Sequence, residues 1–278
     1  VPEWNQFNEI TGGLRPREFT ILCGSTGKGK TTWLASLSSR LIKATTPHVV
    51  FSVETGHEDF LRRTLSCLDG QDLNTGDAIS IDEVDRIRNE YSDVMKKSQS
   101  YFFPYENRIA HWTLLADLLY SSETLGCKIA MIDNLNYFLE VTSAQNERIE
   151  IDRVIHDLIV FVKQVDMHII MVMHPRKTDG GRVESEFDVK GSSTAVQEAH
   201  NVILFNVPHQ DDWDTYNPHI HREVKFAKLR RRGYGAGKKI ILKNSFSDYE
   251  EVIQDVSSRA SHNGNYRKFS EGLPARND

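Results

Sequence analysis

The feature that most constrains the fold of this chain is the stretch LCGSTGKGKTTWL at residues 22–34. Gly24 is followed by four residues and then by Gly29, Lys30 and Thr31, which is the spacing of a phosphate-binding loop. The apolar run EFTILC precedes the loop, and a stretch with helical spacing, KTTWLASLSSRLIKA, overlaps its end. This strand–loop–helix context directs backbone N–H groups at bound phosphates. We therefore predict a nucleotide-binding loop comprising Gly24, Ser25, Thr26, Gly27, Lys28, Gly29, Lys30, Thr31 and Thr32.

Two side chains of this loop have expected roles in binding a nucleotide. Lys30 would reach the β- and γ-phosphates, and the Thr31 hydroxyl would coordinate Mg²⁺. A carboxylate must hold the same metal, and Asp133 ends the apolar run KIAMIDN. A strand-end aspartate that merely caps a turn is the alternative, but the four apolar residues before Asp133 favour the metal role. The predicted cofactors are ATP, or another nucleoside triphosphate, and Mg²⁺.

Two further polar residues follow apolar runs that have the character of strands. Glu54 ends FSVE, where a carboxylate could accept a proton from an attacking water, and His174 ends VMH. A glutamate at a helix N-terminus is also favoured by the helix dipole, so spacing alone leaves the role of Glu54 open. The carboxyl ends of parallel strands share one edge of a sheet. Glu54, Asp133 and His174 therefore form a convergent set that predicts a site for hydrolysis.

The rest of the chain alternates between short apolar runs and helical patterns. HVVFSVE, KIAMIDN, HIIMVMH and NVILFNV are typical of parallel strands covered on both faces, and RIEIDRVIHDLIVFVKQV predicts an amphipathic helix. We therefore predict an α/β fold with a mostly parallel central sheet flanked by helices. HREVKFAKLR and KKIILKN flank RRGYGAG and predict a C-terminal antiparallel hairpin. One domain is expected over 1–256, followed by a polar, disordered tail over 257–278.

The composition restricts the class of protein only weakly. The formal net charge of −5 does not indicate a strongly basic nucleic-acid binder, although a local basic patch is compatible with it. The three cysteines, Cys23, Cys67 and Cys127, form no CxxC pair, so we expect reduced thiols and an intracellular location. No apolar run has the length needed to span a bilayer, so no membrane partner is expected. The start, VPEWNQF, lacks a methionine, and we expect a fragment of a longer protein.

Several stretches together resemble a known family. HPRKTDGGRVESEFDVKGSSTAVQEAHNVIL, at residues 174–204, and MIDNLNYF, at 131–138, are similar to the RecA-like replicative hexameric DNA helicases of the DnaB-like superfamily. Within that superfamily they look most like the Twinkle helicases and the related phage primase–helicases. The resemblance runs from about Trp4 to Ser247. It implies a RecA-like P-loop NTPase core.

The resemblance also implies roles for individual residues. Lys30 would be the phosphate-binding lysine, Glu54 the catalytic glutamate and His174 the residue that senses the γ-phosphate. Lys228 and Arg230, in FAKLRRRGYG, match a K-x-R motif whose side chains would reach the nucleotide of a neighbouring subunit, Arg230 as the arginine finger. Arg231 and Arg232 follow directly, so the choice among the three arginines stays open, and the register of the motif favours Arg230.

In this family, loops that follow two of the strands line the central hole of a ring. The second of these loops here runs from Pro175 to about Thr194 and also contains acidic residues, so its composition alone is that of a solvated loop. The first loop, Thr142 to Arg148, is a weaker candidate, and Phe246 or Tyr249 could stack on the nucleotide base unless they belong to the core. The resemblance implies DNA contacts from Arg176, Lys177, Arg182, Lys190, Gly191 and Ser192.

The expected function is therefore an NTP-dependent replicative DNA helicase domain. It would translocate on single-stranded DNA as a ring, expected to be a hexamer, and unwind duplex at a fork. The alternative is a RecA-like recombination or DNA-clamp ATPase that binds single strands without unwinding, and a third is a nucleotide switch that signals to a partner. An upstream linker helix is not seen, so this chain alone is expected to assemble weakly. The cytoplasm of a bacterial or phage-infected cell is favoured over the mitochondrial matrix.

Overall fold

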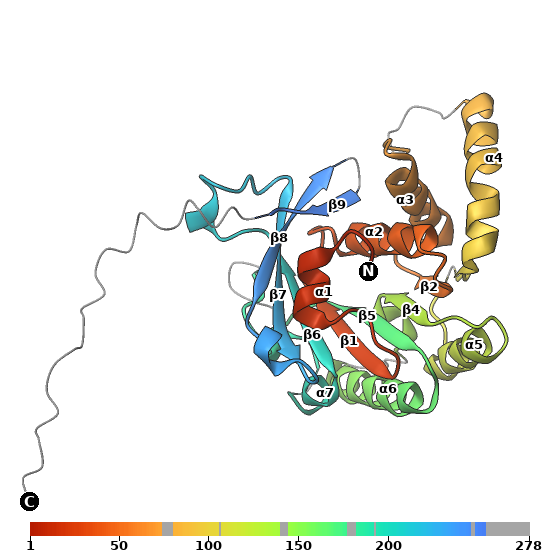
Figure 1. Cartoon of the computed structure of the whole chain (residues 1–278). Helices are drawn as coiled ribbons and strands as arrows, with labels where there is room; N and C mark the ends of the chain where they lie inside the picture. Colours follow the sequence, from red (N-terminus) through yellow and green to blue (C-terminus); the bar gives the residue numbers. More distant parts are fainter. Residues whose placement is uncertain are drawn as a thin grey trace, which may run out of the picture.

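The computed structural model describes residues 1–73, 80–105, 107–139, 144–176, 182–191, 193–245 and 248–253. Within these residues the strands form one sheet in the order β3-β2-β4-β5-β1-β6-β7-β8-β9 (Figure 1). The strands are β1 (Glu18–Cys23), β2 (His48–Ser52), β3 (Ser100–Phe102), β4 (Ile129–Asp133), β5 (His168–Met173), β6 (Asn201–Asn206), β7 (His221–Leu229), β8 (Lys239–Ser245) and β9 (Asp248–Glu251).

The sheet has a parallel part and an antiparallel part. β3, β2, β4, β5, β1 and β6 pair in parallel, whereas β7, β8 and β9 continue the sheet as antiparallel strands. The predicted hairpin is confirmed, because β7 pairs with β8 from His221 opposite Lys243 to Lys225 opposite Lys239. The mostly parallel α/β fold predicted from the sequence is therefore correct.

Helices cover both faces of the sheet (Figure 1). On one face, α1 (Asn5–Thr11), α2 (Lys30–Lys43) and α3 (His57–Asp69) contribute buried apolar side chains to a core with the sheet, and α4 (Ile81–Ser98) packs outside α2. On the other face, α5 (His111–Glu123), α6 (Ala144–Gln164) and α7 (Ser193–Glu198) cover a second core. Short 3₁₀ turns lie at Leu135–Phe138, Glu186–Asp188, Gln210–Asp212 and Gly233–Gly235.

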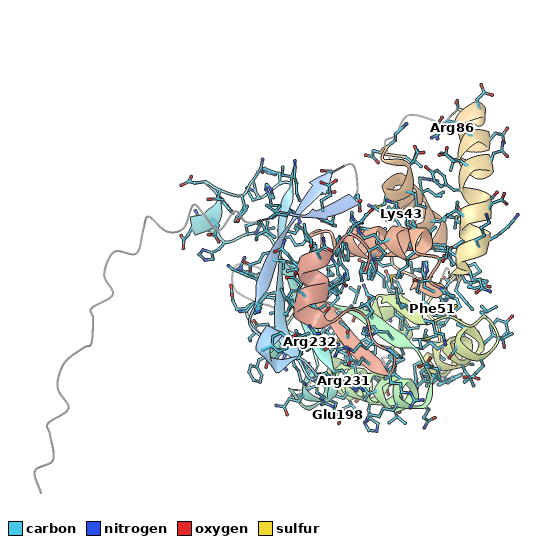
Figure 2. The ribbon with its side chains drawn as sticks, viewed as in Figure 1. Lys43, Phe51, Arg86, Glu198, Arg231 and Arg232 are labelled. Atoms are coloured by element: carbon cyan, nitrogen blue, oxygen red, sulfur yellow. The ribbon has the colours of Figure 1, made fainter. Side chains whose placement is uncertain are left out.

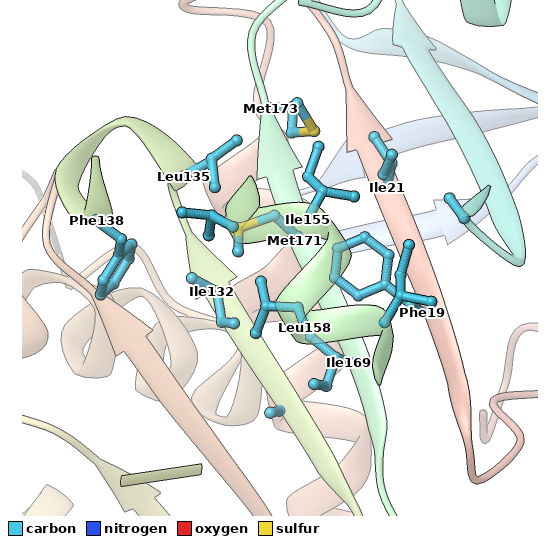
Figure 3. Packing of buried hydrophobic residues seen from close by; sticks show 14 of the residues in the cluster. Phe19, Ile21, Ile132, Leu135, Phe138, Ile155, Leu158, Ile169, Met171 and Met173 are labelled. Carbon is cyan, nitrogen blue, oxygen red and sulfur yellow. The ribbon is translucent and has the colours of Figure 1, made fainter. Parts of the chain in front are cut away.

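The two cores follow from the alternation of side chains along each strand. In β1, Phe19 and Ile21 point to the core under α6, whereas Leu22 belongs to the core under α2. Figure 3 shows Phe19 and Ile21 beside Ile169 and Met171 of β5, with Leu158 of α6 among them. Because both faces are buried, these strands read as continuous apolar runs, which is why they could be predicted.

This topology brings the ends of four parallel strands to one edge. Gly24 follows β1, Glu54 lies just beyond β2, Asn134 follows β4, and His174 follows β5. The register of the strands places these four residues at the same height along the sheet, since Ser52 is opposite Asp133 and Cys23 is opposite Met173. The convergent edge expected from the sequence is thus present.

Several elements have no counterpart in the sequence-based prediction. Segment 70–127 holds α4, β3 and α5, and β9 follows the predicted hairpin. α1 is also new, and Trp4 just before it stacks on Trp33 of α2 at 5.1 Å between ring centroids. The expected tail over 257–278 lies outside the described residues. In the part of the chain that the structure describes, no helix is long and apolar enough to cross a membrane.

Candidate functional site

The phosphate-binding loop connects β1 to α2 as the motif predicts. Lys30 begins α2, and its Nζ donates a hydrogen bond of 3.0 Å to the carbonyl of Ser25, which folds the side chain back over the loop. Gly29 has a φ of +93°, and a Cβ there would overlap the Tyr249 hydroxyl. The sequence requires glycine at this position for both conformation and space. Burial lowers the pKa of Lys30, opposed by the Asp133 carboxylate.

A pocket of about 240 Å³ lies directly over this loop. It combines hydroxyl and amide donors of the loop with charged groups from α3 and the β2 end. Arg63 of α3 contributes a guanidinium whose Nε is buried and has no hydrogen-bond partner among the described residues. Buried unpaired donors are costly, so this nitrogen is suited to an acceptor from a ligand such as a phosphate oxygen. The lining residues are Thr26, Gly27, Gly29, Lys30, Thr31, Thr32, Glu54, Thr55 and Arg63.

The two expected metal ligands are in contact. Thr31 Oγ1 donates a hydrogen bond of 2.6 Å to Asp133 Oδ2, and Asp133 is only 1% exposed. Burial, with a contribution from the Glu54 carboxylate, raises the pKa of Asp133 to about 6, although the Thr31 hydroxyl and Lys30 oppose the shift. A hydroxyl and a carboxylate beside a phosphate loop are the oxygen donors that Mg²⁺ uses together with nucleotide phosphates and water. This donor set fits Mg²⁺, and a cation here would stabilise the charged form of Asp133.

Glu54 and His174 are joined by a residue that sequence analysis did not select. The side-chain nitrogen of Asn134 contacts Glu54 Oε2 and lies 3.0 Å from His174 Nε2. His174 Nδ1 lies 3.5 Å from the Thr26 hydroxyl of the phosphate loop. Glu54 and His174 are themselves 3.8 Å apart between Oε2 and Nε2. The three side chains form one connected cluster next to the pocket over the loop.

A second residue missed by sequence analysis forms a hydrogen bond with the backbone of the phosphate loop. Arg222, in β7, donates from Nε to the Lys28 carbonyl at 2.7 Å. Its Nη1 donates to the Pro218 carbonyl at 2.9 Å and to the His221 carbonyl at 2.6 Å. Because a guanidinium has five rigid N–H donors, one side chain can link the phosphate loop to the segment that leads into β7. No sequence motif marks this arginine.

Lys228 and Arg230 do not join this cluster. Both lie at the end of β7, and their side chains donate to the Gln197 carbonyl of α7, Arg230 at 3.0 Å. The Arg230 backbone N–H bonds to His200, whose own N–H bonds to Phe19 at the start of β1. Arg230 is thus level with the amino end of β1, and the phosphate loop follows the carboxyl end. An arginine here faces away from its own nucleotide site.

The two arginines that follow have partners in their own chain. Arg231 Nε lies 3.3 Å from Glu18 Oε1, and Arg232 Nη1 donates to the Glu9 carbonyl at 2.8 Å. Figure 2 shows both beside α1 and β1. Arg230 is exposed, and its guanidinium has only a backbone carbonyl as a partner among the described residues. The choice of Arg230, made from the register of the motif, stays a prediction.

The second candidate DNA loop folds back onto α6. Lys190 Nζ pairs with Glu147 Oε1 of α6 at 2.7 Å, and Arg176 donates from Nη2 to the Gly191 carbonyl. Gly191 has a φ of +118°, and a Cβ would lie 2.9 Å from Ile151, so its glycine is required by packing. These residues line a pocket of about 290 Å³ with Arg148. Arg148 was expected in the first loop, but the structure places it in α6, which begins at Ala144, so a loop reaching to Arg148 is wrong. Lys177 and Ser192 lie outside the described residues.

Two of the expected ligand contacts are not favoured by the geometry. Arg182 is occupied by Glu223, which is 1% exposed, and by Glu184 at 2.6 Å, so its contacts are those of a structural residue. Tyr249 is also 1% exposed and packs edge-on against Phe205 at 5.7 Å. Stacking of Tyr249 on a nucleotide base is therefore wrong, because its ring belongs to the core. Phe246 lies outside the described residues.

The fold and this site together define a RecA-like P-loop NTPase domain. Residues 2–251 match the model of the DnaB-like helicase C terminal domain family, so the chain belongs to that family. It is 22% identical over 214 residues to a DNA helicase/primase of Enterobacteria phage T3, covering 74% of this chain and 38% of that protein. The chain thus spans well under half the length of this curated relative.

Two solved structures have the same fold. One, described as a DnaB-like replicative helicase and its interactions with primase, matches with a TM-score of 0.72 and 15% identity, over 91% of this chain and 62% of that chain. The other, described as an ATPase domain, matches with a TM-score of 0.69 and 15% identity over 90% of each chain.

Proposed function

We propose that this chain is the motor domain of a replicative DNA helicase. It hydrolyses ATP, or another nucleoside triphosphate, with Mg²⁺ and translocates on single-stranded DNA within a hexameric ring. The observation that carries the proposal is a division of the catalytic groups. Phosphate-binding, metal-binding and water-orienting residues meet at one edge of the sheet, whereas Lys228 and Arg230 lie at the other. A site divided in this way is complete only between two subunits.

The binding step rests on the phosphate loop and its neighbours. Lys30 leaves the Ser25 carbonyl for the β- and γ-phosphates, and Arg63 supplies a further donor from α3. Mg²⁺, held by Thr31 and Asp133, would neutralise charge on the phosphate oxygens. Glu54 would orient and deprotonate the attacking water from the next strand end.

Coupling to a neighbour depends on the exposed end of β7. Arg230 of one subunit would stabilise charge on the γ-phosphate held by the next, with Lys228 beside it. Lys190 and Arg176 would contact the phosphate backbone of a single strand without reading its bases. Since the loop that holds them begins directly after His174, movement of this strand end would move both the nucleotide site and the DNA contacts. The resemblance to a phage helicase/primase favours a phage-infected or bacterial cell as the setting.

Unwinding of a forked DNA substrate tests the proposal. Lys30→Ala should abolish unwinding and weaken nucleotide binding, whereas Arg230→Ala should abolish unwinding with binding retained. Arg231→Ala removes an equally charged neighbour that pairs with Glu18, and it should retain most unwinding. Hydrolysis that is stimulated by single-stranded DNA, without any strand separation and with filaments in electron micrographs, would favour the recombination-type ATPase instead.

A further inference from the structure

The side-chain amide of Asn134 contacts three groups at once. Its Oδ1 accepts a hydrogen bond of 3.0 Å from the Asn136 backbone N–H, and its nitrogen faces Glu54 and His174. Asn134 is 2% exposed, so water does not compete for these contacts. A buried amide whose donors and acceptor all have partners is fixed in place.

These partners determine which end of the amide faces which group. The Asn136 N–H can only donate, so it must meet the amide oxygen. An ionised Glu54 carboxylate can only accept, so it must meet the amide nitrogen. A flipped amide would set two donors together on one side and two acceptors together on the other. Both hydrogens of the Asn134 NH₂ are therefore directed at Glu54 and His174.

This orientation fixes the state of the histidine ring. An N–H of Asn134 faces His174 Nε2 at 3.0 Å, so Nε2 must accept and cannot carry a proton. The ring proton of the neutral histidine then lies on Nδ1, which faces the Thr26 hydroxyl of the phosphate loop. We propose that Asn134 is a positioning residue that sets His174 as an Nδ1–H donor toward the nucleotide while holding the Glu54 carboxylate.

The alternative is a direct ion pair between Glu54 and a protonated His174. The 3.8 Å between Glu54 Oε2 and His174 Nε2 is longer than a charge-assisted hydrogen bond, and the amide already lies between them. Burial and then Lys30 lower the pKa of His174, which also favours the neutral ring. A neutral Nδ1–H donor suits phosphate oxygens, which can only accept, so the ring can respond to a γ-phosphate by making or losing one hydrogen bond.

The amide also affects Glu54. A donated hydrogen bond limits the directions in which the Glu54 side chain can lie. The contribution to turnover rests on the proposed roles of Glu54 and His174, whereas the ring state of His174 does not. The two can therefore be tested separately.

The ring state can be read from ¹⁵N–¹H correlation spectra of the nucleotide-free chain labelled with ¹⁵N-histidine, at a pH where the ring is neutral. His174→Gln identifies the His174 signals. We expect the Nδ1–H tautomer in the unaltered chain. In Asn134→Asp, a carboxylate that only accepts replaces the donor, so the proton should move to Nε2 or the ring should become charged. An Nε2–H ring in the unaltered chain would overturn the proposal.

Turnover supplies the second readout. Asn134→Leu should keep the volume of the side chain and lower kcat by about tenfold or more, with KM changed by less than about twofold. Asn136→Ala keeps the backbone N–H that orients Asn134, so the tautomer of His174 should be unchanged in this control. Unaltered kcat in folded Asn134→Leu would refute the positioning role. An Nδ1–H ring in a chain without hydrolysis would instead count against the proposed function alone.

Discussion

Lys30 and Arg230 lie at opposite edges of the same sheet. Lys30 follows the carboxyl end of β1, and Arg230 is bonded through His200 to Phe19 at the amino end of that strand. The five residue-to-residue steps from Phe19 to Gly24 span roughly 16 Å in an extended strand. A single subunit therefore cannot bring both side chains to one nucleotide without rebuilding its sheet.

The separation predicts complementation between two inactive variants. Lys30→Ala removes the phosphate-binding group, and Arg230→Ala removes the group offered to the neighbour. In a random 1:1 mixture, about a quarter of the head-to-tail interfaces would pair an intact loop with an intact finger. Basal ATP hydrolysis should therefore reappear on mixing. No recovery, with assembly confirmed by light scattering, would place both groups in one subunit's site.

We predict that the buried carboxylate of Asp133 lowers the stability of the nucleotide-free chain. The pKa of Asp133 in the folded state, about 6, lies above the ordinary aspartate value. Between about pH 4 and pH 6 the folded state therefore keeps a proton that the unfolded state has lost. Stability therefore falls as pH rises through this range, and the penalty is complete above it. Asp133→Asn should stabilise the nucleotide-free chain by about 3 kcal/mol at pH 7.5 and by about half of that at pH 5.

Urea unfolding at the two pH values measures this effect. Asp93→Asn changes an exposed carboxylate of α4 and should leave stability within about 0.5 kcal/mol. Mg²⁺-dependent hydrolysis should be lost only in Asp133→Asn. Equal or lower stability of Asp133→Asn at pH 7.5 would show that the carboxylate is not strained by burial.

Arg222 is predicted to matter for nucleotide affinity. Arg222→Ala leaves the Lys28 carbonyl without its donor, so the phosphate loop should lose its fixed conformation. Loss of a charged hydrogen bond is worth about 1.5–3 kcal/mol, which corresponds to an increase in nucleotide Kd of about tenfold or more. His219→Ala keeps the neighbouring backbone carbonyls and serves as the control. Titration with a fluorescent nucleotide checks the difference, and equal Kd values would exclude this role.

The Lys190–Glu147 ion pair is predicted to oppose DNA binding. Glu147→Gln should free Lys190 and strengthen binding to single-stranded DNA, because the competing carboxylate is removed. Lys190→Ala should weaken binding and reduce the slope of log affinity against log salt by about 0.7. Lys163→Ala, at the other end of α6, removes the same charge and should change the slope little. Fluorescence anisotropy over a salt series measures both, and an unchanged slope in Lys190→Ala would remove it from the interface.

The sequence was sufficient to predict the phosphate loop and the parallel strands. Both depend on local patterns, since the loop has fixed spacing and strands buried on both faces read as apolar runs. Glu54, Asp133 and His174 could be selected because each follows such a run. Asn134 could have been found by the same rule, since it is the next residue after Asp133 at the strand end.

Other parts of the site depend on contacts between distant segments. Arg222 and Lys28 are 194 residues apart, and Arg63 reaches the pocket only because α3 packs beside α2. Tyr249 follows the last strand predicted from the sequence, where a base-stacking residue could lie, but it belongs to β9, and the packing of β9 against α2 buries it. Periodicity contains no information on such contacts, and for that reason the sequence did not predict them.

The most direct test of a shared, DNA-coupled site is steady-state NTP hydrolysis over a wide range of protein concentrations, with and without single-stranded DNA. We expect turnover per subunit to rise steeply with concentration, DNA to raise it again, and Arg230→Ala to remove both increases. Turnover that is independent of concentration and of DNA, and that persists in Arg230→Ala, would contradict a shared, DNA-coupled site.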